Sequence, residues 1–444
     1  MKRNFRIIVM LWLPGLISPA LSSGQQPAPY RLTLREAVQR ALEHNVNVLV
    51  ANTQVEEGEA TSSRLKSLAM LPHVQAQLYA NVQRLSLDAF GLTGISTVAL
   101  PEVTGPFANY DYHFAVEQNI VDLHSYRQWK ASQRAVDAGK LDYEGEVDVV
   151  ILAVANLYLN GQTAAARIDA AQWRVTDSGA LYKLAKDKHE AGTATGVDVL
   201  RAQVQLANDK QTLLVAQNQY KQSLIVLARY LGLDPSTPLE LADQLRYHAL
   251  PEAKAETLLP SALLARPDYL ALASQRQALV EQQRANRARY YPKFSIFGGY
   301  GELGRTPGDF HGVGIFQGQI DFTLFERDIS GEAQEIASKL RRVDYQIDDL
   351  RRGIEEDIRE ALLNIESATA QVYVSKEGQD LGHRELEEAQ DRFQSGATNN
   401  IEVITAQDQL ARAQENYILA VSGHNQALFA LAAALADTKS IGQQ

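Results

Sequence analysis

The sequence predicts a mainly α-helical protein in which long helical hairpins alternate with β-strands, each arrangement being present twice. Three observations lead to this prediction. The 444-residue chain contains two long stretches without proline, its second half repeats the first, and short segments of alternating apolar and polar residues precede each pair of expected long helices. Hydrophobic residues make up 45% of the chain and charged residues 22%, as in ordinary folded proteins, so disorder is not expected.

A sequence repeat divides the chain into two halves. Gly192 and Gly396 stand in matching glycine turns, and the offset between them is 396 − 192 = 204 residues. The same offset relates residues 119–227 to residues 323–431 without a gap. A repeat of this length indicates a duplicated structural unit. We expect repeat 1 at residues 30–234, an inter-repeat linker at 235–256, repeat 2 at 257–437 and a C-terminal tail at 438–444.

Proline placement predicts long helices in both repeats. All 14 prolines lie at or before Pro106, or between Pro235 and Pro307. A proline inside a helix costs ~3 kcal/mol, so long helices require such proline-free stretches. At ~1.5 Å per residue, a helix over residues 122–191 reaches roughly 105 Å. We expect helices at about 122–191 and 197–230 in repeat 1, and at about 326–395 and 401–434 in repeat 2.

The second helix of each hairpin carries a heptad pattern of apolar and small residues. Such a seam packs the side chains of one helix between those of the next, and small residues let helices approach closely. By itself the pattern also fits a simple coiled-coil rod. The seam residues are Val199, Ala202, Leu206, Asp209, Leu213, Ala216, Tyr220, Ser223 and Leu227 in repeat 1, and Val403, Ala406, Leu410, Ala413, Tyr417, Ala420, His424, Ala427 and Leu431 in repeat 2.

Segments of about ten residues with period-2 alternation predict two strands in each repeat. In the clearest of them, Val74, Ala76 and Leu78 alternate with Gln75 and Gln77. The pattern is typical of a barrel strand with lipid on one side and water on the other, although a soluble sheet also shows it. We expect strands at about 73–84 and 109–120 in repeat 1, and at about 293–303 and 312–325 in repeat 2.

The strands also predict an oligomer. No segment after the N-terminal region reads as a transmembrane helix, so a membrane-inserted form must use its strands. Four strands are too few for a membrane barrel, which has at least about eight, and lipid does not tolerate an open sheet edge. Several chains must therefore share one barrel.

The first residues have the order of a secretory signal peptide, which we place at residues 1–22. Three basic residues precede an apolar stretch from Ile7 to Leu13, and small residues follow up to Ala20. The alternative, a membrane anchor, needs ~20 apolar residues. The chain has no cysteine, so no disulfide is expected, and its net charge of −10 argues against a nucleic-acid partner.

No motif in the sequence predicts catalysis, a cofactor or a metal site. Residues 299–304 read GYGELG, the glycine spacing of a dinucleotide fingerprint, but Pro307 follows where a fingerprint would open a helix. We therefore expect a glycine-rich strand that runs into a loop. His189-Glu190 lacks the second histidine that a zinc site on a helix requires. No set of nucleophile, base and orienting residue is visible, so we expect no enzyme, and specifically no hydrolase.

Several short motifs occur in a fixed order. They are residues 32–37, Arg266-Pro267-Asp268-Tyr269, and two tip motifs at residues 191–200 and 396–404. With the duplicated hairpins and strands, they resemble the TolC-like outer-membrane efflux protein family over nearly the whole chain after the signal segment. The resemblance implies a homotrimer whose twelve-stranded barrel, with four strands from each chain, stands in the outer membrane. Below the barrel, a tunnel of α-helices extends into the periplasm.

The resemblance also implies a function and its partners. The expected function is passive conduction, for efflux or type I secretion, of a substrate that an inner-membrane RND or ABC pump delivers through a periplasmic adaptor. The barrel would contact outer-membrane lipid, and no cofactor is implied. The alternative is a non-conducting periplasmic coiled-coil envelope protein, which a conductance measurement distinguishes from a channel.

Two glycine turns at the helical tips are the candidate docking sites for the adaptor. They cap hairpins roughly 100 Å long and so lie farthest from the membrane. Their residues are small and uncharged, which suits packing against another helical hairpin, although they also fit turns that only reverse the chain. The residues are Gly192, Thr193, Ala194, Thr195 and Gly196 in the first turn, and Gly396, Ala397, Thr398, Asn399 and Asn400 in the second.

A candidate aperture lies beside these turns. Asp198 and Glu402 are equivalent by the repeat (198 + 204 = 402) and stand in the first turn of the returning helices. The helix dipole alone favours a carboxylate there, by ~0.3–1 kcal/mol. A trimer would bring six such carboxylates to the narrowest ring of the tunnel, where the resemblance places its aperture. A ring of acidic groups favours cations.

Basic and aromatic neighbours complete the candidate aperture. Arg201 and Arg392 are expected to hold the mouth closed where they reach the carboxylates, and Phe393 is expected to narrow the ring. The family often carries an aromatic, an arginine and a further acidic residue near the second tip. This chain has Phe393, Thr398 and Thr405 at those places, so a tightly locked gate is not expected.

Overall fold

The computed structural model describes residues 30–93, 100–249, 254–306 and 308–443. The expected signal segment at residues 1–22 lies outside the described residues. The mainly helical fold predicted from the sequence is confirmed. The elements in chain order are β1 (Tyr30–Leu32), α1 (Leu34–His44), α2 (Val46–Met70), β2 (His73–Ser86), β3 (Val103–Val121), α3 (Leu123–Glu190), α4 (Gly196–Tyr230), β4 (Leu239–Leu241), α5 (Ala255–Ala265), α6 (Pro267–Ala288), β5 (Lys293–Gly304), β6 (Phe310–Asp321), α7 (Arg327–Ser395), α8 (Asn400–Ala434) and the 3-10 helix η1 (Thr438–Gln443).

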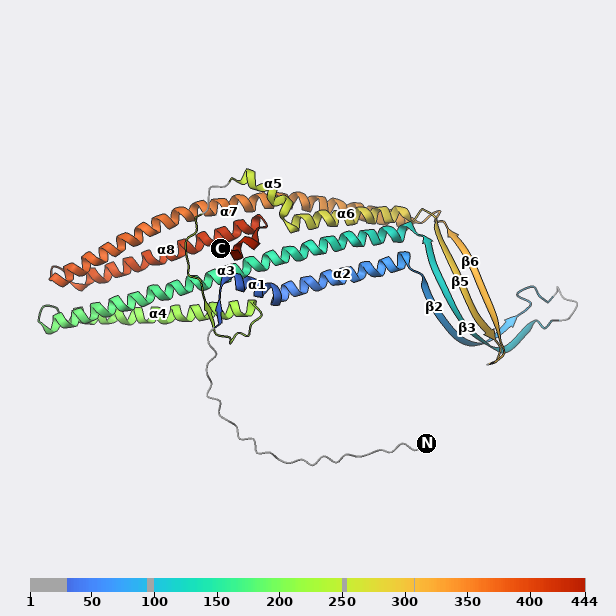
Figure 1. The fold of residues 1–444 in the computed structure, drawn as a ribbon, viewed down its shortest axis with the longest axis horizontal. Helices are drawn as coiled ribbons and strands as arrows, with labels where there is room; N and C mark the ends of the chain where they lie inside the picture. Colours follow the sequence, from blue (N-terminus) through green and yellow to red (C-terminus); the bar gives the residue numbers. More distant parts are fainter. Residues whose placement is uncertain (1–29, 94–99, 250–253, 307, 444) are drawn as a thin grey trace, which may run out of the picture.

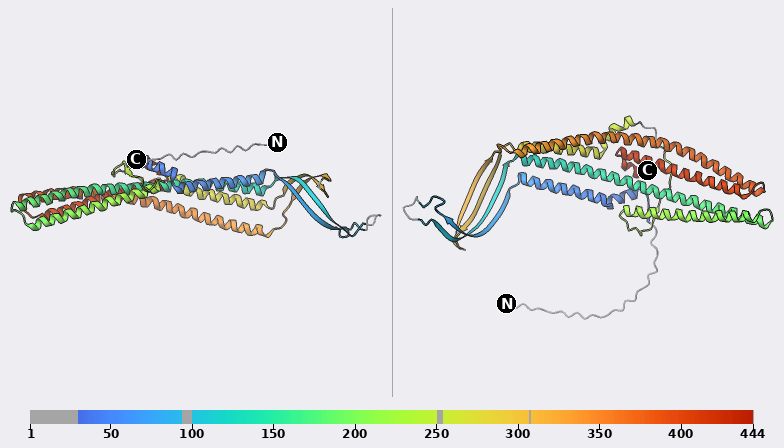
Figure 2. Two further views of the ribbon diagram at one scale, coloured as in Figure 1. Left: turned by 90° about the horizontal axis from the view of Figure 1, so that it is seen from below. Right: turned by 180° about the vertical axis from the view of Figure 1, so that it is seen from behind.

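The helices form one elongated layer with the sheet at one end and two tips at the other (Figure 1). The long helices α3 and α7, of 68 and 69 residues, run nearly the length of the layer. Toward the tips the helices contact one another in the order α7-α8-α3-α4, and toward the sheet in the order α7-α6-α3-α2. Figure 2 shows the same layer edge-on and from behind. The outermost helices of the layer are α7 on one side, and α4 and α2 on the other.

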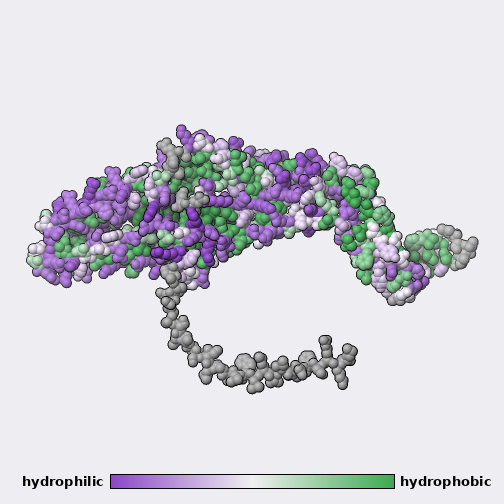
Figure 3. Space-filling model, viewed as in Figure 1, coloured by the Kyte–Doolittle hydropathy of each residue, from purple (hydrophilic) through white to green (hydrophobic). Residues whose placement is uncertain are grey.

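Four strands form one antiparallel sheet in the order β2-β3-β5-β6. The pairing register places apolar residues in rows across one face, such as Val74, Val116, Gly298 and Phe316. Hydrophobic residues gather over the part of the sheet next to the helices, whereas the helical layer is mostly hydrophilic (Figure 3). The opposite face carries the polar side chains Gln75, Gln77, Asn81, Asp111, His113, Glu117, Gln317 and Gln319.

Two strands differ in length from the expectation. β6 ends at Asp321, four residues short of the expected end at 325, because Asp321 already pairs with Lys293, the first residue of β5. Beyond that point no neighbouring strand offers partners. β3 begins at Val103 instead of about 109, because the end of β2 extends to Ser86 and pairs with Val103.

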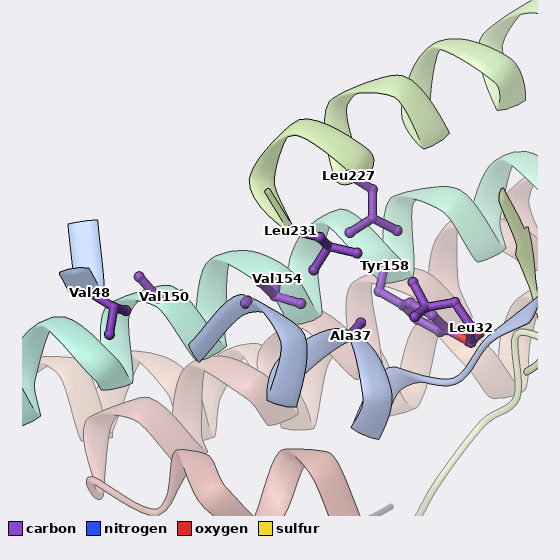
Figure 4. Close-up of a cluster of buried hydrophobic side chains, with 9 residues drawn as sticks. Leu32, Ala37, Val48, Val150, Val154, Tyr158, Leu227 and Leu231 are labelled. Atoms are coloured by element: carbon purple, nitrogen blue, oxygen red, sulfur yellow. The ribbon is translucent and has the colours of Figure 1, made fainter. Parts of the chain in front are cut away.

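The hydrophobic core of repeat 1 lies at mid-length, where α1, α2, α3 and the end of α4 meet (Figure 4). The linker takes part in this core, since β4 pairs in parallel with β1. The Tyr158 hydroxyl lies 2.8 Å from a carboxylate oxygen of Asp243 and 2.9 Å from the Leu32 carbonyl oxygen. Burial raises the pKa of Tyr158, so this hydroxyl keeps its proton. The cluster residues are Leu32, Ala37, Ala41, Val48, Val150, Val154, Tyr158, Leu227 and Leu231.

The expected C-terminal tail is folded against this region. η1 buries Thr438 and Ile441 against the helical layer, and the Thr438 hydroxyl donates to the Asp148 carboxylate. The expected linker also contacts the helical layer beyond β4, because the Asn425 side-chain amide of α8 donates to the Arg246 carbonyl oxygen at 2.8 Å.

One helix departs from the expectation that none would read as a membrane span. By length and composition, α3 contains one 18-residue window apolar enough to cross a membrane, and half of that window is buried inside the protein. α3 supplies Val150, Val154 and Leu159 to the central clusters. Protein packing therefore accounts for the apolar composition of α3.

Candidate functional site: the two helical tips

Each helical hairpin reverses direction at a glycine in the left-handed conformation. Gly192 has φ +77° and Gly396 has φ +79°, values that only glycine adopts without strain. The next residues close matching bonds: the Thr193 amide donates to the Lys188 carbonyl oxygen at 2.8 Å, and the Ala397 amide to that of Arg392 at 2.9 Å. The two turns are therefore structural copies, as the sequence repeat requires.

The returning helices start on different N-caps. Thr195 and Asp198 form a capping box at the start of α4, in which each side chain accepts the other's backbone N–H, at 3.3 and 3.1 Å. At the start of α8, Asn399 caps alone by accepting the Ile401 amide at 3.1 Å. Asp198 thus has a structural role that Glu402 does not share.

An arginine reaches each predicted aperture carboxylate. The Arg201 guanidinium lies 3.7 Å from Asp198, and that of Arg392 lies 3.3 Å from Glu402. Both arginine side chains are about half exposed. Glu402 is itself partly exposed, and an exposed pair contributes only ~0.2–1 kcal/mol. Asp198 is only 8% exposed and also takes part in the capping box of α4.

The two tips are joined to each other through a buried asparagine. Asn400 is fully buried, and its side-chain amide donates to the Asp198 carbonyl oxygen at 2.6 Å. Lys188 makes a second link, donating to the Gln394 carbonyl oxygen at 3.0 Å. The sequence grouped Asn400 with the candidate docking residues, whereas the structure buries its side chain, and this amide serves the contact between the hairpins. A buried amide in an N-terminal first turn leaves no sequence signal by itself.

Phe393 also packs between the hairpins. Its ring is 3% exposed, in a cluster with residues of α3, α4 and α8, and the Lys188 ammonium lies 5.4 Å from the ring centre. In this conformation Phe393 packs between the two hairpins and does not project into open space. Contrary to the expectation from the sequence, it therefore does not narrow the candidate aperture here. Thr405 donates to the Ile401 carbonyl oxygen at 2.8 Å, within its own helix.

The remaining tip residues form a small, uncharged surface. Ala194 and Thr398 are half-buried. The exposed ones are Gly192, Thr193, Thr195, Gly196, Gly396, Ala397 and Asn399.

Above the tips, a charged junction ties the hairpins together. Arg174 of α3 lies 2.8 Å from Asp209 of α4 and 3.6 Å from Asp408 of α8. Asp209 is only 2% exposed, so its charge depends on this arginine. One heptad farther from the tips along α8, Arg167 holds Glu415 through two nitrogens, at 2.9 and 2.5 Å. The sequence signal for this junction is Asp209 itself, an acidic residue at a seam position of an otherwise apolar and small heptad.

The glycine string at residues 299–304 lies in β5, as expected. A Cβ atom at Gly301 would overlap His113 and the backbone of Tyr112 on β3. The string therefore permits close approach of strands. Among the described residues, no group of three or more His, Asp or Glu side chains is placed to hold a metal ion.

The fold defines a class of protein. A sheet of four strands with one apolar face, joined to a layer of helices roughly 100 Å long, is the architecture of a channel subunit of the bacterial outer membrane. Residues 37–233 and 258–437 match the outer membrane efflux protein family, and the chain belongs to this family. It is an outer-membrane channel that serves efflux, and its helices extend into the periplasm.

Two relatives and one solved structure illustrate the similarity. The chain is 25% identical over 410 residues to the pyoverdine export outer membrane protein OpmQ of Pseudomonas aeruginosa, covering 86% of this chain and 80% of OpmQ. It is 24% identical over 406 residues to the toluene efflux pump outer membrane protein TtgF of Pseudomonas putida, covering 87% and 79%. The outer-membrane channel OprN has the same fold, with a TM-score of 0.76 at 17% identity, over 90% of this chain and 89% of OprN.

Proposed function

We propose that three copies of this chain form a twelve-stranded barrel and a continuous tunnel of helices that conducts an efflux substrate across the outer membrane. The observation that carries the proposal is the pair of unpaired sheet edges, β2 and β6. Lipid does not tolerate such edges, and four strands from each of three chains give 4 × 3 = 12. Because β2 and β6 of one chain run antiparallel, β6 of one copy can continue onto β2 of the next around a closed ring.

The helical layer has matching edges. On α4, Leu200 and Val204 are 62% and 59% exposed and lie on the side of the helix opposite Ala202, which packs inward. On α7, Val374 and Leu381 are 70% and 55% exposed and lie opposite Val372. Apolar residues at both outer edges of one layer fit side-by-side packing of copies, head to tail.

The faces of the sheet fit a water-filled barrel. On one face of the sheet, rows of paired residues such as the row from Val74 to Phe316 present valine, phenylalanine and glycine, which suit contact with lipid. The other face carries glutamine, asparagine and charged residues, which suit a lumen, together with apolar residues such as Phe297, Val313 and Ile315. Each strand has at least 12 residues, more than the ~9–11 needed to span the hydrocarbon layer.

The exposed tips are the surface that we assign to a periplasmic adaptor, which would connect the channel to an inner-membrane RND or ABC pump. Gly192, Thr193, Gly396 and Ala397 offer small, uncharged atoms at the end of the molecule. In the closed ring, Asp198 and Glu402 from three chains would surround the mouth and favour cations. The cargo class we expect is a small organic compound, because pyoverdine and toluene are the cargoes named for the two relatives.

The experiment that tests the channel combines mass and conductance. Full-length protein extracted in mild detergent should have the mass of three chains by light scattering, and it should produce discrete conductance steps in planar bilayers. A monomer recovered as soluble periplasmic protein contradicts the barrel. A trimer without conductance favours the non-conducting coiled-coil envelope protein.

A further inference from the structure

A small cavity lies where the two helical hairpins meet, about three helical turns from the tips. Side chains from all four long helices line it: Trp173, Arg174 and Asp177 of α3, Asp209 of α4, Leu386 of α7, and Gln407, Leu410, Ala411 and Gln414 of α8. It leaves about 20 Å³ of room for the centre of a water molecule. One buried water needs ~10–15 Å³ on the same measure, so the cavity has room for a single water molecule.

Gln407 is the residue that points to a ligand. It is 8% exposed and lines the cavity, yet neither its amide oxygen nor its amide nitrogen has a hydrogen-bond partner in the protein. A buried amide without partners is costly, and native proteins satisfy such groups with protein atoms or ordered water. Because Gln407 offers both a donor and an acceptor, its partner must be able to do both.

Two carboxylates line the same cavity and differ in their partners. Asp209 accepts from Arg174 and is nearly fully buried. Asp177 is half-buried, and among the described residues no hydrogen bond reaches it. Burial raises the pKa of Asp177, with the charge of Asp209 adding to this and His383 opposing it. Within the described chain, the cavity therefore holds a carboxylate that receives no hydrogen bond and an amide without a partner, and a small group that can both donate and accept fits it.

We propose that the cavity binds one ordered water molecule, which connects Gln407 of α8 to Asp177 of α3 and Asp209 of α4. Such a water would donate to the carboxylates or the Gln407 oxygen and accept from the Gln407 nitrogen, which meets the two to four partners that buried waters have. Water is favoured over a metal ion because no group of three metal-ligating side chains occurs among the described residues. The inference does not depend on the proposed trimer or cargo.

The water completes a polar contact between the hairpins. Gln205 of α4 already lies 3.3 Å from Asp408 of α8, and Arg174 bridges the same two helices. Without the water, Gln407 would be the unsatisfied member of this junction. The junction therefore fixes the part of α8 that leads to the predicted aperture residue Glu402, on the same helix.

A structure of the full-length protein at a resolution that shows ordered water tests the site directly. The expected result is one water peak per chain within hydrogen-bonding distance of the Gln407 amide and Asp177. A soak with rubidium or thallium distinguishes the alternative, because an anomalous peak in the cavity would identify a monovalent cation and overturn the assignment. A cavity without density would also overturn it.

Thermal unfolding of the detergent-solubilised protein provides the second test. Gln407→Leu keeps the volume but leaves the water without its donor and acceptor, so the midpoint should fall by several degrees. If the cavity contains no water, the same substitution removes an unsatisfied amide, and the unfolding midpoint should stay the same or rise. An unchanged or raised midpoint would therefore contradict the proposal. Gln203→Leu, the same change at an exposed position of α4, is the matched control and should leave the midpoint unchanged.

Discussion

At the scale of single residues, the described part of the chain partly buries several carboxylates. Nearby hydrogen bonds and positive charges do not fully offset the cost of burying their negative charge. Burial raises the pKa of Asp148, although the Thr438 hydroxyl and the charge of Lys439 oppose this. A raised pKa in the folded state means that folding favours the neutral carboxyl. Its contribution to stability is therefore present below the unfolded pKa of ~3.9 and is lost as the pH rises through the folded pKa.

We expect Asp148→Asn to raise the unfolding midpoint at pH 7.5 and to have a smaller effect at about pH 3, below the unfolded pKa of ~3.9, because a carboxyl with a raised folded pKa is then mostly neutral in both states. The amide oxygen can still accept from Thr438. The gain should stay below ~1 kcal/mol, because the carboxyl is partly solvated. Asp169→Asn, at an exposed carboxylate of the same helix, is the control. If the midpoint of the variant differs from that of the wild type by the same amount at both pH values, the burial effect is ruled out.

The aperture carboxylates give the second residue-scale prediction. Asp198→Asn with Glu402→Gln preserves side-chain oxygens near both helix starts and removes six charges from a trimer. Single-channel recordings should show reduced cation selectivity, because the charge that concentrates cations at the mouth is gone. Glu387→Gln, an exposed change on α7, is the control. Unchanged selectivity and conductance in the double variant would leave Asp198 with its capping role alone.

At the scale of elements, the contact between the hairpins mixes charges with apolar residues. Removing one partner of a buried ion pair leaves the other charge unpaired, which costs ~3–5 kcal/mol when burial is complete. Arg174 is 28% exposed and Asp209 only 3% on their side chains, so a smaller cost applies here.

We expect Arg174→Met to lower the unfolding midpoint by several degrees, roughly 2–3 kcal/mol, because Asp209 then lacks its cation. Adding Asp209→Leu should restore much of the loss, since the unpaired charge disappears. Arg412→Met, at an exposed arginine of α8 beside the same junction, should have little effect. If the double variant is as unstable as the single one, the ion pair is not the cause.

The glycine turns give the second prediction at this scale. Nothing lies within 4 Å of a Cβ atom at Gly192 or Gly396, so a larger side chain fits and meets only the strain of a positive φ. That strain is ~1–2 kcal/mol. The variants Gly192→Ala and Gly396→Ala introduce the backbone strain with only a small side chain. Tryptophan at either position introduces the same strain together with a large side chain.

If the turns dock on an adaptor, the tryptophan variants should abolish export in cells while trimers persist, and the alanine variants should retain export. Thr193→Trp, at an exposed residue outside the glycine position, should also abolish export. Normal export from all tryptophan variants would mean that the turns only reverse the chain.

At the scale of the whole molecule, the edges of one chain determine assembly. The layer ends at α7 and β6 on one side, and at α4, α2 and β2 on the other (Figure 1). Within the described chain, α5 packs on the middle of α7, and the strand edges of β2 and β6 have no further strand beside them. These edges, with exposed apolar residues such as Leu200 on α4 and Val374 on α7, are the basis of the proposed assembly of three copies.

We expect Val374→Asp, on the exposed edge of α7, to prevent trimer formation, because a carboxylate would be buried against the next chain. Light scattering in mild detergent should then report monomers. Gln371→Asp lies about 60° around the same helix, where it is exposed, and should leave the trimer intact. A stable trimer of the Val374 variant would place the interface elsewhere.

Several features of the fold follow from local rules, and for these the sequence was sufficient. Interior proline is excluded from long helices, glycine marks left-handed turns, and an alternating pattern marks a strand with two different faces. The four long helices therefore lie within one residue of their expected bounds, and the turns at Gly192 and Gly396 are where the repeat puts them. Strand ends were less accurate, because a strand stops where its neighbour stops, as β6 does opposite Lys293.

The tertiary structure decided which side chains meet across the hairpins. Residues about two hundred positions apart come together at the tips, where Asn400 bonds to the backbone of Asp198 and Phe393 fills the space between helices. Periodicity predicts that a helix face is buried, but it does not specify which helix covers that face. For that reason the sequence identified Asp198 and Glu402 by their place in the repeat and named Arg201 and Arg392 as their basic neighbours. The buried amide and the junction at Arg174 became visible only once the helices were packed.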